Sequence, residues 1–399
     1  MLQPHSSGVA ALVLMLVILP VVTMDLQLAA MPDIGRAFNA PVSAVQATLS
    51  AFAGVFGLLQ LVYGPLSDRL GRKPIIVGGM LLFGLASVGA VLSTSIEMLT
   101  AMRMLQAVGA TAGPVLGRAA IRDVHGARGA ARMLGYVMGA FGLFAIIGPF
   151  LGGVLVDAFD WRAAFIGMAG FGFSAALSCW LLFPETRPDA EVRDRASFRQ
   201  LLRTYAKLLS TRQVLMFVVA GGLMQGAFFA WLAGSPFIIM NLFGYSGTAY
   251  GLILPITLVG FIAASFASGR LAGRIPLHRL IVMGLLLAFV SALVGLLLAL
   301  VGLNALWAII IPIIGVGIGH GVTLSQCAGG AMAPYPQHAG AASALAGFFQ
   351  YLGVMTSVAL TGLLFDGSAL PVIAVMAGLV VAATLVFMPN VRALAAQAS

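Results

Sequence analysis

Residues 64–73 read Gly-Pro-Leu-Ser-Asp-Arg-Leu-Gly-Arg-Lys, a short polar stretch between two long apolar ones. In a chain of 399 residues with only 8% charged side chains, this is a dense polar segment. Six of its residues have special chemistry at fixed spacing: Gly64, Asp68, Arg69, Gly71, Arg72 and Lys73. Basic residues alone would fit an ordinary loop on the positive side of a membrane. The acidic residue and the two glycines indicate a more specific structure.

The composition of the whole chain places that loop in a membrane protein. Hydrophobic residues make up 61% of the sequence, and the mean hydropathy is +1.06. A water-soluble domain of this length could not bury so much apolar surface, so lipid must form part of the solvent.

Twelve apolar stretches are each long enough to cross a bilayer as a helix, which takes ~20 residues. The sequence therefore predicts an all-α integral membrane protein with twelve transmembrane helices. Their expected ranges are 9–31, 44–63, 75–93, 98–117, 133–155, 163–183, 214–240, 250–268, 280–302, 305–328, 340–364 and 370–388.

Positive charge is distributed unevenly over the loops between these spans. With both termini in the cytosol, 18 of the 21 Lys and Arg residues lie on the cytosolic side. Arg36 and Arg162 fall outside, and Arg103 lies within a span. This bias predicts cytosolic termini. The net charge of +9 thus reflects topology and anionic lipid headgroups, and no nucleic-acid partner is expected.

The chain divides into two halves of six spans. Residues 1–183 and 214–399 are the expected bundles, and residues 184–213 are the linker between them. Basic residues recur every fourth position in the linker, opposite an apolar face, which predicts an amphipathic helix on the inner leaflet: Arg195, Arg199, Arg203 and Lys207. The halves repeat weakly, since Gly269, Leu271 and Arg274 follow Gly64, Leu66 and Arg69 by 205 residues. Cys179 and Cys327 lie in spans, so no disulfide framework is expected.

Three motifs make the chain resemble the major facilitator superfamily of secondary transporters. The stretch from Gly64 to Lys73 fits the cytosolic loop motif between its second and third helices. In the fourth span, Arg103, Gln106 and Gly109 are similar to the family's fourth-helix motif, with Ala107 where glycine is usual. In the fifth span, Gly148, Pro149, Gly152 and Gly153 match a string typical of the drug:proton antiporters, with Phe144 where an upstream glycine is usual.

The resemblance implies a major facilitator fold of two pseudo-symmetric six-helix bundles around a central cavity. Spans 1, 4, 7 and 10 line that cavity in the family. Each of them carries an interior proline here: Pro20, Pro114, Pro236 and Pro312. A proline frees a backbone carbonyl, which a neighbouring helix or a water-filled cavity must satisfy. Such prolines are also common in membrane helices generally, so the pattern agrees with the resemblance without establishing it.

Buried charge marks the place where the chemistry is expected. Asp25 is the one acidic residue well inside a span, and Arg103 is the one basic residue. Each lies about five or six residues from the outer end of its span, so the two are expected at similar depth. We interpret Asp25 as the proton carrier and Arg103 as a residue that tunes it or contacts substrate. A purely structural Asp25–Arg103 pair is the alternative.

Several uncharged residues are candidates for the substrate cavity. His320 is the one imidazole deep in a span, where it could be a second proton site, a substrate contact or a packing residue. The other candidates are polar or aromatic residues of spans 4, 7, 10 and 11: Gln106, Phe228, Phe229, Trp231, Gln326, Phe349 and Tyr351. An apolar cavity with few charges favours small amphipathic substrates.

The charged loop after the second span is interpreted as a gate. In the family, its aspartate joins a cytosolic charge cluster that holds the outward-open state. The residues that match or could complete such a cluster are Gly64, Asp68, Arg69, Gly71, Arg72, Lys73, Arg122 and Glu185. The string from Asp157 to Phe165, at the outer end of the sixth span, also resembles the antiporter branch.

Taken together, these residues predict a proton-coupled antiporter similar to the Bcr/CflA-type drug-resistance exporters, including phenicol exporters. We expect a monomer in the bacterial cytoplasmic membrane, driven by the proton gradient, with no cofactor or bound metal. No metal-ligand cluster, nucleotide loop or nucleophile–base spacing points to an enzyme. A narrow metabolite exporter, an uptake symporter and a non-transporting sensor with this fold are the alternatives.

Overall fold

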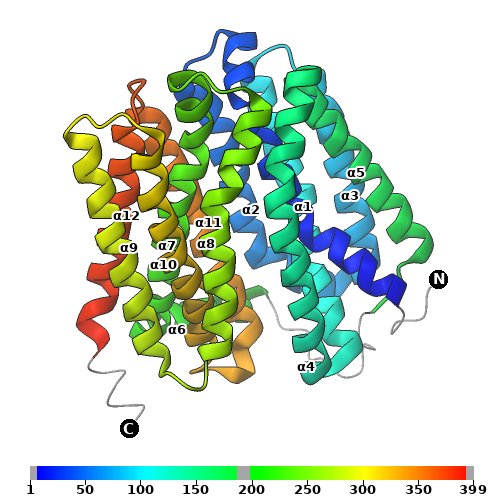
Figure 1. Ribbon diagram of the computed structural model, residues 1–399. Helices are drawn as coiled ribbons and strands as arrows, with labels where there is room; N and C mark the ends of the chain where they lie inside the picture. Colours follow the sequence, from blue (N-terminus) through cyan, green and yellow to red (C-terminus); the bar gives the residue numbers. More distant parts are fainter. Residues whose placement is uncertain (1–6, 187–197, 392–399) are drawn as a thin grey trace.

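In the computed structural model, which describes residues 7–186 and 198–391, the chain is a bundle of long helices (Figure 1). The helices are α1 (Ser7–Phe38), α2 (Val42–Leu70), α3 (Arg72–Val91), α4 (Ile96–Ala158), α5 (Trp161–Leu182), α6 (Phe198–Ser210), α7 (Arg212–Pro236), α8 (Gly247–Leu271), α9 (Leu277–Leu300), α10 (Leu306–Met332), α11 (Ala339–Leu364) and α12 (Leu370–Phe387). Short turns of other helix types follow α7 (Phe237–Leu242) and α12 (Met388–Asn390) and precede α11 (Pro336–His338). No strand occurs in the described part of the chain, so the all-α prediction is confirmed.

Ten of these helices are long and apolar enough to cross a membrane, counted over the described residues. Their bounds agree with the predicted spans to within a few residues at most ends. The main exceptions are α1 and α2, which continue to Phe38 and Leu70, beyond the predicted ends at residues 31 and 63. In α1, Ile34 packs in the core within this extension.

Helix α4 contains both the fourth and the fifth predicted span. A straight helix of its 63 residues would be ~95 Å long, about three times the hydrocarbon thickness of a bilayer. Arg162, just after α4, donates from Nε to the carbonyl oxygen of Val91, just before α4, at 3.2 Å. Because the two ends of α4 are neighbours, the chain must turn back within it, and the two spans run antiparallel.

The loops gather at two opposite faces of the bundle (Figure 1). We call the face with loops 39–41, 92–95, 159–160, 243–246, 301–305 and 365–369 the predicted outer face. The face with Gly71, loops 272–276 and 333–335, and α6 is the predicted cytosolic face. Of the linker, α6 lies on helices α7 and α11, and Tyr205 donates to the carbonyl oxygen of Leu61 at 3.0 Å. Arg195 lies outside the described residues.

Helices before the linker meet helices after it along two seams. One seam joins α2 to α11, where the ring centroids of Phe56 and Tyr351 are 4.3 Å apart. The other joins the second stretch of α4 to α8, where a Cβ at Gly153 would collide with the carbonyl oxygen of Gly247. Glycine is required at position 153 because the two backbones touch there.

Candidate functional site

The polar stretch of residues 64–73 is part of a compact charge cluster. Arg72 is 3% exposed, and each nitrogen of its guanidinium has a partner. Nε donates to Asp123 Oδ2 at 2.5 Å, Nη1 to Ser67 Oγ at 2.9 Å, and Nη2 to Asp68 Oδ1 at 3.2 Å. We call Asp68, Arg72, Asp123 and Glu185 the Arg72 cluster.

Glu185 closes this cluster from the segment that follows α5. Its carboxylate accepts from the backbone nitrogens of Arg72 at 3.0 Å and Lys73 at 3.2 Å, which are the first residues of α3. An acidic group at a helix N-terminus is favoured by the exposed N–H groups. Gly71 has φ +96° and a Cβ there would lie 2.8 Å from Glu185 Oε2, so glycine is needed for both conformation and space.

The remaining gate candidates lie at the edge of the cluster. Arg122 is exposed, and its neighbour Asp123, which sequence reasoning did not select, provides the buried carboxylate. The Arg-Asp dipeptide was the available signal, but helix phase decides which of its members faces Arg72. Arg69 is exposed, and a Cβ at Gly64 would meet nothing within 4 Å.

Asp25 lies inside the bundle, 8% exposed, against the motif of the fifth span. A Cβ added to Gly148 would come within 3.0 Å of Asp25 Cβ, and one at Gly152 within 3.2 Å of Leu26 Cα. Because these two glycines have no side chain, α4 packs closely against α1 and leaves space for the Asp25 carboxyl group. The Oδ2 atom is buried and has no hydrogen-bond partner among the described residues.

Arg103 is fully buried and points to a different neighbourhood. Its guanidinium carbon lies 4.4 Å from the ring centroid of Phe52, and Nη1 donates to Gln106 Oε1 at 2.7 Å. Gln106 in turn donates to Ser87 Oγ at 2.7 Å, so this glutamine joins α4 to α3. Within the described part of the chain, Nε and Nη2 of Arg103 are buried without a hydrogen-bond partner.

Asp25 and Arg103 have similar depth but do not form a pair. The helices cross where Gly113 meets the carbonyl oxygen of Leu16; Asp25 is nine residues, or ~13 Å, from that point, and Arg103 ten residues, or ~15 Å. No ion pair within 4 Å joins the two among the described residues. The alternative of a structural pair is therefore wrong for this structure, because Arg103 faces α2 and α3 while Asp25 faces the second stretch of α4.

The string from Asp157 to Phe165 ties several helix ends together at the predicted outer face. Asp157 accepts from the backbone nitrogens of Gly247 at 2.9 Å and Thr248 at 2.7 Å, the first residues of α8. Burial raises the pKa of this carboxyl group, but the hydrogen bonds from Thr248 and Gly247 outweigh burial and leave the pKa below its ordinary value. Asp157 thus fastens the α4–α8 seam, a role that the family string alone did not reveal.

The predicted cavity residues fall into separate groups. Tyr351 packs on Phe56 at the α2–α11 seam, and Phe349 and Phe229 are half-buried. Trp231 is fully buried and donates from Nε1 to Thr257 Oγ1 at 3.3 Å. These residues do not form a single lining.

Two polar candidates belong to the helices after the linker. Gln326 donates to Ser268 Oγ at 2.7 Å, joining α10 to α8. His320 is 1% exposed and packs against the rings of Phe228 and Phe261, with Nε2 2.9 Å from Gln225 Oε1. Phe228 and His320 are therefore neighbours.

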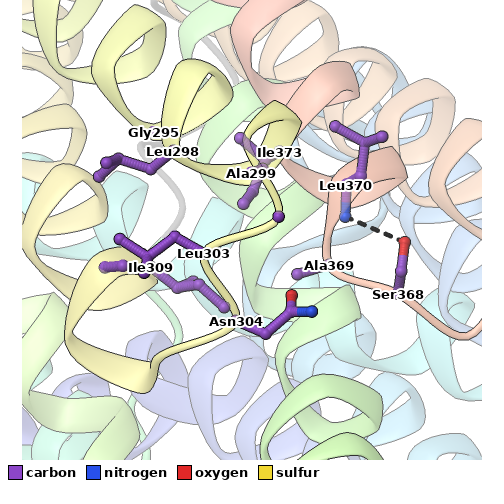
Figure 2. Close-up of a pocket in the computed structure, with 12 residues that line it drawn as sticks. Gly295, Leu298, Ala299, Leu303, Asn304, Ile309, Ser368, Ala369, Leu370 and Ile373 are labelled. Atoms are coloured by element: carbon purple, nitrogen blue, oxygen red, sulfur yellow. Dashed lines mark hydrogen bonds between the residues drawn. The ribbon is translucent and has the colours of Figure 1, made fainter.

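Two cavities open at the predicted outer face. Figure 2 shows one of about 160 Å³ between α9, the 301–305 loop and the start of α12, next to the hydrogen bond from the Leu370 nitrogen to Ser368 Oγ. The other, of about 310 Å³, is lined by Asp33, Arg36 and Asp157 and by the segment between α7 and α8. Neither is lined by a residue that the sequence assigned to substrate.

Comparisons with known proteins agree with this geometry. Residues 13–358 match the Major Facilitator Superfamily. The chain is 32% identical to multidrug resistance protein D of Escherichia coli (strain K12), over 88% of this chain and 89% of that protein. It is 30% identical to a chloramphenicol resistance protein of Pseudomonas aeruginosa, over 81% and 76%.

A solved structure supports the fold. The chain superimposes with a TM-score of 0.75 on a bacterial homologue of the human lysosomal transporter Spinster in an inward-facing, occupied conformation. The alignment covers 98% of this chain and 97% of that one, at 15% identity.

Proposed function

The chain belongs to the major facilitator superfamily, and we propose that it is a proton-coupled antiporter that exports small amphipathic compounds, phenicol antibiotics among them. Asp25 is its proton carrier. The relatives named for multidrug and chloramphenicol resistance support the substrate class. The transporter is a monomer of the bacterial cytoplasmic membrane with both termini in the cytosol, and the proton gradient is its energy source.

The observation that carries this proposal is the unpartnered Oδ2 of Asp25. A buried carboxylate with no cation and no donor is costly to ionise, so the carboxyl group holds its proton in this arrangement. A rearrangement that brings water or a cation to Asp25 releases the proton. Ionisable groups inside membranes are functional by default, because their burial is expensive.

Close contacts of α4 connect Asp25 to the α4–α8 seam. Gly148 and Gly152 contact α1 beside Asp25, and Gly153, one residue further, contacts α8 at Gly247. When α8 moves against α4, the wall of the Asp25 site moves with it. Proton release and helix rearrangement are therefore coupled through one short stretch of α4.

Arg103 is the second half of this mechanism. Its two unpartnered donors leave a buried positive charge without compensation. We assign them to a substrate acceptor group, or to ionised Asp25 in another arrangement of the helices. Gln106 and Phe52 hold the guanidinium in place for either partner.

The Arg72 cluster is the cytosolic gate in this proposal. It ties the α2–α3 turn to α4 through Asp123 and to the segment after α5 through Glu185. Opening that face would require these contacts to move together, because the guanidinium that binds Asp123 and the backbone nitrogen that binds Glu185 both belong to Arg72.

Transport in proteoliposomes tests the proposal. A proton gradient is imposed, chloramphenicol or a lipophilic dye is added, and lumenal pH is followed. Wild-type protein should release protons on substrate addition, and Asp25→Asn should abolish this release while the protein stays folded. Asp366→Asn is the matched control, since Asp366 lies in an exposed loop and accepts hydrogen bonds from the backbone nitrogen and the hydroxyl of Ser368. Retained coupling in Asp25→Asn would overturn the carrier assignment.

A further inference from the structure

His320 packs in a cluster of three aromatic rings within the helices that follow the linker. Its ring centroid is 4.9 Å from that of Phe228 on α7 and 4.8 Å from that of Phe261 on α8, with interplanar angles of 24° and 19°. The rings of Phe228 and Phe261 are themselves 5.7 Å apart, so the three rings form a triangle. These contacts orient the imidazole, and its two nitrogens lie on the ring edge.

One nitrogen on that edge is already used. Nε2 lies 2.9 Å from Oε1 of Gln225, and an amide oxygen only accepts hydrogen bonds. Nε2 therefore carries the hydrogen of the neutral ring, and Nδ1 is left as a bare acceptor. Nδ1 is buried and has no partner among the described residues. An unsatisfied buried polar group costs about 1–3 kcal/mol, so Nδ1 requires a donor from elsewhere.

The surroundings define what kind of donor fits. Phe228 is buried, whereas Gln225 and Phe261 are half-buried. A nearby polar pair is also uncharged. Trp231, one helical turn after Phe228, donates a hydrogen bond to the hydroxyl of Thr257. Among the described residues, no charged side chain hydrogen-bonds to His320 or stacks on it.

Close packing of α8 on α10 maintains this geometry. A Cβ at Gly317 would lie 3.1 Å from the carbonyl oxygen of Thr257, and one at Gly321 would collide with that of Phe261. These glycines flank His320 on α10 and let α8 approach closely enough for Phe261 to stack. The acceptor is thus built into the backbone packing of two helices.

We propose that Nδ1 of His320 is a substrate-binding acceptor that takes a hydrogen bond from a hydroxyl or amide N–H of an uncharged, partly aromatic substrate. Phe228 and Phe261 orient the imidazole, and Gln225 is a positioning residue that fixes which nitrogen carries the hydrogen. This inference rests on the proposed export function, and it identifies the chemical feature by which that transporter recognises its substrate.

Binding measurements on the full-length protein in detergent test this assignment with two probes. Chloramphenicol has hydroxyl and amide donors, whereas tetraphenylphosphonium is a lipophilic aromatic cation that has no hydrogen-bond donor. His320→Gln places an amide near the Nε2 position and removes the Nδ1 acceptor. His320→Asn places a polar group near the Nδ1 position and is the matched variant.

The expected result is a selective loss of affinity. A neutral hydrogen bond is worth about 0.5–1.5 kcal/mol, so His320→Gln should raise the Kd for chloramphenicol about 2- to 13-fold. The Kd for tetraphenylphosphonium should stay within 2-fold, and His320→Asn should retain more chloramphenicol affinity than His320→Gln. A chloramphenicol analogue whose hydroxyls are replaced by fluorine should be insensitive to His320→Gln if a hydroxyl is the donor, and should remain sensitive if the amide is.

Three other outcomes would overturn the inference. Equal weakening of both probes would show a packing role, and unchanged affinity for both would show that Nδ1 binds only water. Failure of wild-type protein to bind either probe would remove the substrate class as well. Proton release in proteoliposomes separates the two proposals: if it is normal while His320→Gln shows no selectivity, the export function stands and the His320 assignment falls.

Discussion

Arg72 and Arg103 are both buried arginines, yet they are satisfied to opposite degrees. Arg72 is 3% exposed and donates from all three guanidinium nitrogens, two of them to carboxylates. Arg103 is 0% exposed and donates only to an amide oxygen, with Nε and Nη2 unpartnered. The first belongs to a loop at a face of the bundle, and the second lies inside it.

The difference indicates that the charge of Arg72 stabilises the fold, whereas the charge of Arg103 is free to bind another partner. Removing one member of a buried ion pair leaves the other uncompensated, so a satisfied arginine is strongly coupled to folding. An unsatisfied buried arginine lowers stability already, and its presence needs a functional reason. Removing the charge should therefore lower the free energy of unfolding strongly at Arg72 and change it little at Arg103.

Arg72→Met should give the largest loss of stability. It leaves Asp123, whose side chain is 9% exposed, without its cation. We expect the free energy of unfolding to fall by about 3–5 kcal/mol. Unfolding in mixed detergent micelles measures this change. Arg199→Met on exposed α6 is the control, and a similar small change in both variants would contradict the structural role of Arg72.

Arg103→Met should separate stability from transport. Removing a charge that lacks a counter-ion should change the free energy of unfolding by no more than about 1 kcal/mol. Proton-coupled transport, measured in proteoliposomes, should fall at least about 10-fold under the proposed mechanism. Destabilisation as large as that of Arg72→Met would show that the two arginines do not differ in kind.

Asp157→Ala probes a carboxylate that holds two helices together without an arginine. Loss of the contacts to Gly247 and Thr248 should cost about 0.5–2 kcal/mol, as for other helix N-terminal acceptors. The pKa of Asp157 is below its ordinary value, so its contribution is present above the usual aspartate pKa. That contribution is lost as pH falls through the lowered value. The stability difference between wild type and variant should therefore persist at pH 7 and vanish in strong acid, and a pH-independent difference would contradict this.

Asp68→Asn should have the smallest effect on stability. Its side chain is 43% exposed and its bond to Arg72 is 3.2 Å long, so we expect a loss of about 1 kcal/mol or less. If the cluster is the gate, turnover should slow more than substrate affinity declines. Transport rates and equilibrium binding measured on the same variant decide the point, and loss of binding alone would contradict a gating role.

The spans and their order could be predicted from the sequence because hydropathy and loop charge are local properties. The predicted stretches at 98–117 and 133–155 both occur, although one helix, Ile96–Ala158, contains them. Glu185 was predicted to join the charge cluster, and its carboxylate lies there. Asp123 was missed because a one-residue shift on a helix rotates a side chain by 100°, and sequence alone does not set that phase.

The relation of Asp25 to Arg103 shows the limit of such reasoning. Counting residues along each helix gives similar depth, and the structure agrees. Counting cannot give the direction in which each helix faces, and here Asp25 meets Gly148 while Arg103 meets Phe52. The distance between two side chains depends on helix rotation and on neighbours far away in sequence.

The sequence by itself determined the membrane class, the spans, the family resemblance and the rarity of buried charge, since each depends on composition or on spacing within a segment. Only the tertiary structure decided which charges are paired, that Asp157 binds the start of α8, and that His320 packs against Phe228 and Phe261. Those features join residues from different helices. They depend on the packing of backbones at positions such as Gly153 and Gly247, where side-chain volume decides how closely two helices approach.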